Sequence, residues 1–141
     1  MVSQRQTRWN TNSAEPACLI VEDSAFDLER LCRVVRQCRP KMPIETAKTL
    51  RSARLALEKG GIALILLDNN LPDGWGTEFA LELAQVKQWS KIPIVIVSDW
   101  PSPFMWQKAE RAGVIKTMSK QEFDGRALSA ALNTRVRRRA S

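Results

Sequence analysis

The segment Ile62-Ala-Leu-Ile-Leu-Leu-Asp68-Asn-Asn-Leu-Pro72-Asp-Gly74-Trp-Gly76 decides the fold of this chain of 141 residues. Six apolar residues run directly into the carboxylate of Asp68. An unbroken apolar run is typical of a strand buried on both faces, as in a parallel sheet covered by helices. The proline and the glycines that follow end the strand. We therefore expect Asp68 at the carboxyl end of a buried strand, where open α/β sheets place their ligands.

Strands and helices are predicted to alternate along the rest of the chain. The other strands are expected at 17–21, 44–47 (an edge strand), 92–97 and 114–118. Helices are expected to begin near Ser24, Thr49, Thr77, Ser102 and Gln121. This alternation implies right-handed crossovers and an α/β fold, with helices on both faces of a parallel sheet. We expect a flexible arm over 1–15, a single folded domain over 16–133 and a basic tail over 134–141.

Composition excludes several classes of protein. No apolar run is long enough to cross a bilayer, and the first residues lack the apolar core of a signal peptide, so we expect a cytoplasmic protein. The three cysteines have no metal-like spacing and are predicted to be reduced and mostly buried. The chain contains no histidine, which excludes Ser-His-Asp catalysis, imidazole metal sites and a phosphohistidine on this chain.

The net charge of +7 suggests nucleic acid binding, but its distribution argues against this function. Four of the arginines lie within 133–141, so the excess is mainly terminal. A short basic run is more often a solvated helix end than a binding arm. The chain also lacks the glycine motifs of dinucleotide-binding and P-loop proteins.

The predicted strands end in a complementary set of polar residues. The first strand delivers Glu22 and Asp23, the third Asp68, the fourth Ser98 and the fifth Lys120. Parallel strands bring these ends to one edge of the sheet. Clustered carboxylates repel one another and suit Mg²⁺, whereas a lysine and a hydroxyl suit a phosphoryl oxygen. Each residue alone is more often a turn, cap or surface residue, but the four strand ends together indicate a site.

At this point the sequence resembles the receiver domain of response regulators in two-component signalling. The resemblance covers about residues 16–133 and lies in Val21-Glu22-Asp23-Ser24, Leu67-Asp68-Asn-Asn-Leu-Pro72-Asp-Gly-Trp-Gly76, Ile94-Val-Ile-Val-Ser98 and Met118-Ser-Lys120. It implies a flavodoxin-like (βα)5 fold with strand order 2-1-3-4-5.

The resemblance also assigns roles to individual residues. Asp68 matches the phosphoacceptor, Ser98 the hydroxyl that moves to the phosphoryl group, and Lys120 the lysine that pairs with it. The metal ligands implied for Mg²⁺ are Glu22, Asp23, Asp68 and the backbone carbonyl of Asn70, with Asp23 a direct ligand. Pro72 and Gly76 match the loop that shapes the site.

The implied function is a stand-alone receiver that signals by protein contacts and is not an enzyme beyond its own phosphotransfer and dephosphorylation. The donor would be a phosphohistidine on a sensor histidine kinase or on a histidine phosphotransfer protein of a phosphorelay. A downstream protein would read the phosphorylated state. A homodimer could form through the fourth helix, fifth strand and fifth helix. Trp100 and Trp106 are expected on that surface.

Three departures from the family pattern leave an alternative open. Thr117 stands where an aromatic switch residue is often found, Gln121 replaces a proline after Lys120, and Asp99 replaces a small residue after Ser98. A receiver-like scaffold that is never phosphorylated is therefore the alternative. A phosphatase of the haloacid dehalogenase kind needs a second aspartate where this chain has Asn70, which argues against it.

Overall fold

A five-stranded parallel sheet forms the centre of the protein. The computed structural model describes residues 15–140, and their side chains as far as Asn133. The sheet has the order β2-β1-β3-β6-β7, and all its neighbouring strands are parallel. Its strands are β1 (Ala17–Val21), β2 (Ile44–Ala47), β3 (Ile62–Leu67), β6 (Ile94–Ser98) and β7 (Lys116–Ser119). In sequence order this is 2-1-3-4-5, so the predicted flavodoxin-like topology and the edge position of 44–47 are confirmed.

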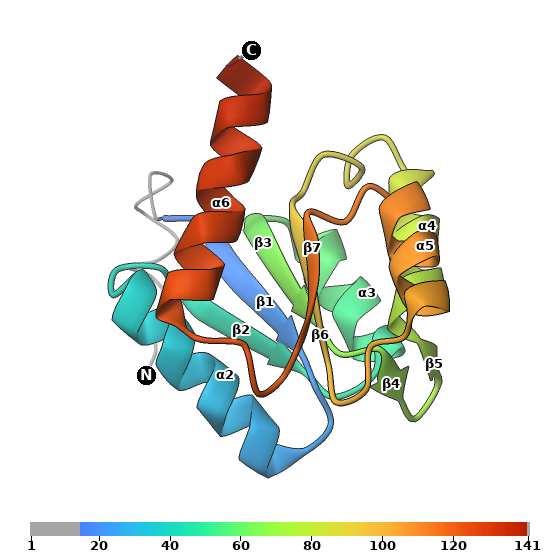
Figure 1. Ribbon diagram of the computed structural model, residues 1–141, viewed down its shortest axis with the longest axis horizontal. Helices are drawn as coiled ribbons and strands as arrows, with labels where there is room; N and C mark the ends of the chain where they lie inside the picture. The colour runs from blue at the N-terminus through green and yellow to red at the C-terminus, as the bar shows by residue number, and fades with distance from the viewer. Residues whose placement is uncertain (1–14, 141) are drawn as a thin grey trace.

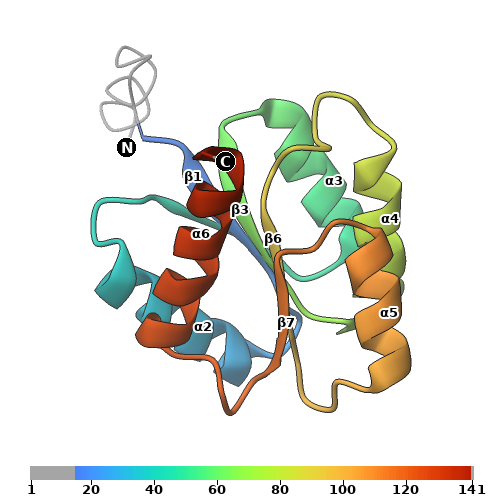
Figure 2. The same cartoon turned by 45° about the horizontal axis from the view of Figure 1, so that its top comes forward.

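Helices cover both faces of the sheet, as Figures 1 and 2 show. One layer contains α2 (Ala25–Cys38) and α6 (Gly125–Ala140). The other contains α3 (Leu50–Lys59), α4 (Gly76–Ala84) and α5 (Pro103–Arg111). Within the part of the chain that the structure describes, no helix is both long and apolar enough to cross a membrane.

The two layers bury alternate residues of the same strands. Leu19, Ile65 and Leu67 pack with Phe79 and Leu83 under α3, α4 and α5. Their neighbours Ile20, Leu64 and Leu66 pack on the other face with Leu31 of α2, Leu128 of α6 and Phe123 in the turn before α6. This double burial is why the strands read as continuous apolar runs rather than as alternating patterns.

Local signals at the helix starts act as predicted. The side chains of Ser24, Thr49 and Ser102 accept hydrogen bonds from the backbone N–H groups three residues on, at 3.3, 3.0 and 3.2 Å. Pro103 occupies the first position of α5, where its missing N–H costs nothing. These bonds satisfy backbone donors that a helix start leaves free.

The cysteines are free thiols, in agreement with the sequence prediction. Cys18 and Cys32 are buried, and Cys38 is half-buried. Burial raises the pKa of Cys18 to about 12, so this thiol stays protonated and unreactive at neutral pH.

The structure differs from the sequence prediction in the start of the last helix and in an additional two-stranded ribbon. The last helix begins at Gly125 instead of near Gln121, because a turn that carries Phe123 into the core comes first. A short antiparallel ribbon of β4 (Asn70–Leu71) and β5 (Gly74–Trp75) also forms in the segment predicted as a plain loop. Gly74 has φ of 151° there, in the region where a side chain would be strained. The predicted arm falls almost wholly outside the described residues, as do the side chains of the basic tail.

The β4–β5 ribbon is fixed to the start of α3 by one carboxylate. Asp73 accepts hydrogen bonds from the backbone N–H groups of Leu50 at 2.9 Å and Arg51 at 3.1 Å. The bond from Leu50 is the largest cause that lowers the pKa of Asp73. The loop after Asp68 is thereby tied to the helical layer beneath it.

We predict that Asp73→Ala lowers the free energy of unfolding by about 1 kcal/mol at neutral pH, as expected for the loss of a helix cap. Since the folded pKa is lowered, this contribution is present above the unfolded pKa and is lost as the pH falls through the folded pKa. Urea unfolding at neutral and acid pH measures both effects. Glu58→Ala, which removes an exposed carboxylate from the same helix, is the control. Equal losses in the two variants would contradict the prediction.

Candidate functional site

The strand ends bring Glu22 and Asp68 together in the interior of the protein. Val21 pairs with Leu67 across the parallel ladder of β1 and β3, so the residues that follow them lie at the same level. Glu22 is fully buried and Asp68 is 5% exposed. Two carboxylates that are both withdrawn from water repel each other strongly, which requires compensation by positive charge.

Glu22, Asp23 and Asp68 form an acidic cluster with the donors that a hard cation prefers. Each offers one carboxylate oxygen, and these three oxygens lie within 4.8 Å of one another. Asp23 is exposed, so the cluster opens to solvent on one side. Oxygen ligands, high negative charge and access to water match the requirements of Mg²⁺. Asn70 follows in β4 with an exposed side chain, and its role as a carbonyl ligand remains a prediction.

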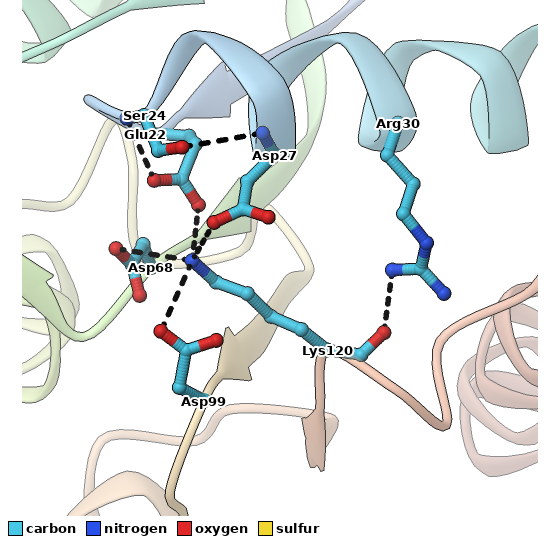
Figure 3. A network of polar contacts seen from close by, with 7 residues as sticks. All are labelled: Glu22, Ser24, Asp27, Arg30, Asp68, Asp99 and Lys120. Carbon is cyan, nitrogen blue, oxygen red and sulfur yellow. Dashed lines mark hydrogen bonds and ion pairs between the residues drawn. The ribbon is translucent and has the colours of Figure 1, made fainter.

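Lys120 places one ammonium group among four carboxylates (Figure 3). Its Nζ lies 2.8 Å from Asp27 Oδ2 and 2.9 Å from Glu22 Oε1. Asp68 Oδ2 and Asp99 Oδ2 each lie 3.8 Å away. The lysine is therefore hydrogen-bonded to Asp27, ion-paired with Glu22 and only close to Asp68.

The charges of Asp68 and Lys120 respond to this environment in different ways. Burial, and then the charge of Glu22, raise the pKa of Asp68 to about 7, against the lowering effects of Lys120 and of the backbone N–H groups of Asn70 and Asn69. Burial alone would lower the pKa of Lys120, but its hydrogen bonds to Asp27 and Glu22 and the charge of Asp68 raise it. Lys120 is thus a permanent cation beside a carboxylate whose charge is costly.

Ser98 ends β6 at the same edge of the sheet and is buried. Its backbone carbonyl accepts a hydrogen bond of 2.9 Å from the N–H of Lys120. The predicted residues therefore lie at the ends of four strands that are successive neighbours in the sheet. They are Glu22, Asp68, Ser98 and Lys120.

The loop after Asp68 wraps closely around the backbone of this residue. Asn69 Oδ1 accepts a hydrogen bond from the N–H of Thr77 at 2.9 Å, and the Asn69 carbonyl accepts one from Gly76 at 2.8 Å. A Cβ atom at position 76 would collide with the carbonyl oxygen of Asp68 and lie 2.9 Å from the Cα of Asn69. Gly76 is therefore required for the chain to pass so close to Asp68.

Sequence reasoning missed two residues that contact Lys120. Asp27 binds its ammonium, and the guanidinium of Arg30 donates a hydrogen bond to its backbone carbonyl. Both lie on α2, where an aspartate in the first turn and an arginine among apolar positions look like ordinary helix residues. Asp99, which replaces a small residue of the family pattern, adds negative charge 3.8 Å from the Lys120 ammonium. Over residues 15–140 every peptide bond is trans, including the one after Lys120.

Comparisons with known proteins identify the family. The sequence matches the profile of the response regulator receiver domain over residues 18–133. No curated protein sequence matches the chain. Among solved structures, a CheY-like receiver domain from Methanospirillum hungatei is 21% identical, with 88% of this chain and 95% of that one covered and a TM-score of 0.74.

Two further similar structures have ligands or modifications named. The Mn²⁺-bound form of the response regulator Rcp1 is 22% identical, with 82% of this chain and 88% of that one covered and a TM-score of 0.69. The phosphorylated cyanobacterial phytochrome response regulator RcpA is 22% identical, with 75% and 81% covered and a TM-score of 0.68. At these identities the likeness shows the shared fold.

We predict that Gly76→Ala lowers the midpoint of thermal unfolding, because the new methyl group must displace the backbone of Asp68 or of α4. A loss of about 1–3 kcal/mol is expected for such overpacking. Gly125→Ala is the control, since a Cβ there meets nothing within 4 Å. Calorimetry of both variants decides the matter, and an unchanged midpoint for Gly76→Ala would rule out the close approach.

We also predict that Asp68→Asn stabilises the metal-free protein above neutral pH. The folded pKa of about 7 lies above the ordinary value of 3.8, so the stability linked to this group is lost as the pH rises through about 7. Thermal unfolding at about pH 8 should occur at a higher temperature in the variant, and the gap should narrow toward about pH 5. A gap that stays constant with pH would show that the charge of Asp68 is not costly.

Proposed function

Because this chain belongs to the response regulator receiver domain family, we propose that it accepts a phosphoryl group on Asp68 from a phosphohistidine of a partner protein. The observation that carries the proposal is the position of buried Asp68. Its carboxylate lies beside those of Glu22 and Asp23 and 3.8 Å from the ammonium of Lys120. The donor histidine lies outside these 141 residues, which contain none.

In the proposed reaction an oxygen of Asp68 attacks the phosphorus atom and the phosphorus–nitrogen bond of the donor breaks. The electron pair of that bond leaves with the imidazole, and the product is an acyl phosphate. Lys120 binds one phosphoryl oxygen, and the hydroxyl of Ser98 donates a hydrogen bond to another. Attack by water later releases inorganic phosphate and restores the carboxylate of Asp68.

A magnesium ion fits the carboxylates of this site. Glu22, Asp23 and Asp68 would hold it together with the backbone carbonyl of Asn70. When bound, the ion neutralises the negative charge that accumulates on the phosphoryl oxygens. The existence of a Mn²⁺-bound form of Rcp1, a response regulator of the same fold, supports the binding of a divalent cation by this chain.

The proposed output is a change in protein contacts and not turnover of another substrate. The surface formed by α5, β7 and α6 and by the loop before α5 carries Trp100, Phe104 and Trp106, which are 87%, 66% and 53% exposed. Such large exposed aromatic side chains are typical of protein interfaces. A downstream protein or a second copy of the chain would bind there, in the cytoplasm, when Asp68 is phosphorylated.

A scaffold that is never phosphorylated is the second candidate. It is favoured by the contacts of Lys120 with Asp27 and Asp99, which engage the lysine before any phosphoryl group arrives. The intact acidic cluster favours the phosphorylated receiver.

One experiment separates these two functions. Beryllium fluoride and Mg²⁺, which together imitate the phosphoryl group, are added while tryptophan fluorescence is followed. Trp75 should respond, because it pairs with Asn70 two residues beyond Asp68. We expect a Mg²⁺-dependent change that Asp68→Asn abolishes, and an alkali-labile phosphate after treatment with a small phosphodonor. A silent signal together with no incorporated phosphate would favour the scaffold.

A further inference from the structure

Two residues of helix α2 contact Lys120, one at its ammonium group and the other at its backbone carbonyl. Asp27 and Arg30 lie about one turn apart and therefore on the same side of the helix. Asp27 binds the ammonium group at 2.8 Å, whereas Arg30 binds the backbone carbonyl of the same residue (Figure 3). Arg30 also binds the backbone carbonyl of Phe123 at 3.1 Å. Both contacts join parts of the chain that are about ninety residues apart.

We propose that Asp27 and Arg30 are positioning residues for Lys120 with opposite effects on the phosphorylated state. Arg30 holds the lysine where it can reach a phosphoryl group on Asp68. Asp27 retains the ammonium in the resting state and so competes with that group. This inference rests on the proposed function, because it concerns how readily Lys120 leaves one partner for another.

The role of Arg30 follows from the backbone around Lys120. This residue lies in a turn between β7 and α6, outside any regular element. Its N–H is fixed by Ser98, and its carbonyl by Arg30. The guanidinium uses two separate nitrogen atoms for its two acceptors, a fork that a lysine at position 30 cannot reproduce. Loss of the fork would free the turn and scatter the positions of the ammonium.

The role of Asp27 follows from the distances at the ammonium. Lys120 Nζ is 2.8 Å from Asp27 but 3.8 Å from Asp68. A lysine that pairs with a phosphoryl oxygen on Asp68 must move away from Asp27, so the ion pair has to weaken. The side chain of Asp27 is 24% exposed and that of Lys120 is 9% exposed, so solvent screens this pair only in part. Asp27 therefore stabilises the state without the phosphoryl group.

The resting contact can be measured without metal or phosphate. In the ¹⁵N-lysine-labelled protein, the ammonium signal of Lys120 should be visible and slow to exchange with water, and it is assigned by its loss in Lys120→Arg. We expect Asp27→Asn to speed this exchange about fivefold, the effect of losing a partly exposed ion pair. Glu29→Gln, an exposed carboxylate on the same helix, is the control and should change nothing. Exchange in Asp27→Asn equal to that of the unaltered protein would overturn the resting role of Asp27.

The competition is measured with beryllium fluoride at saturating Mg²⁺, followed by tryptophan fluorescence. We expect binding about fivefold tighter in Asp27→Asn and about tenfold weaker in Arg30→Lys. Arg33→Lys is the matched control for Arg30, because Arg33 lies on the exposed side of α2 in a pair with Glu29. General destabilisation of the helix would move both variants in the same direction.

The outcomes separate this inference from the proposed function. The positioning roles are overturned if the unaltered protein binds beryllium fluoride but the affinities of Asp27→Asn and Arg30→Lys shift in the same direction. Shifts in affinity no larger than that of Arg33→Lys would overturn them as well. A lack of response in the unaltered protein would overturn the proposed function and, with it, the competition. The ammonium exchange measurement would then still decide whether Asp27 holds Lys120.

Discussion

The single ammonium group of Lys120 is the interaction on which the site depends. The fold withdraws Glu22 and Asp68 from water side by side, and only this cation among the described residues contacts both of them. Without it, two adjacent buried carboxylates could not both stay ionised. Asp27 and Asp99 add further negative charge around the same nitrogen. The site therefore holds more carboxylates than cations, and carboxylate oxygens are the ligands that a hard cation prefers.

Backbone geometry places Asp68 as firmly as charge does. Asp68 follows a strand that is buried on both faces, and the chain then turns so tightly that only glycine fits at position 76. Asn69 Oδ1 accepts a hydrogen bond from the N–H of Thr77 in α4, and the carboxylate of Asp73 accepts one from the N–H of Leu50 in α3. The backbone that follows Asp68 is thus attached to α4 through Asn69 and to α3 through Asp73. A carboxylate on such a support keeps its orientation while its charge and its partners change.

Much of the fold could be read from the sequence because the signals are local. The apolar runs of the strands and the caps at Ser24, Thr49 and Ser102 each involve residues close together in the chain. Parallel strand ends then brought Glu22, Asp68, Ser98 and Lys120 to one edge by topology alone. Asp27 and Arg30 could not be found in this way, since their partners lie about ninety residues away and their own positions fit an ordinary amphipathic helix. The β4–β5 ribbon was missed because each of its strands has only two residues.

The two helical layers pack on opposite faces of one sheet, and the residues that meet at the site are anchored in different layers. Asp68 belongs to a loop fastened to α3 and α4, whereas Lys120 belongs to a turn fastened to α2 beside α6. Their contact of 3.8 Å thus links a loop fastened to one layer with a turn fastened to the other. A change of charge at Asp68 changes the electrostatic attraction between Asp68 and Lys120. Under the proposed function, a chemical change at Asp68 therefore acts at once on residues anchored in both helical layers.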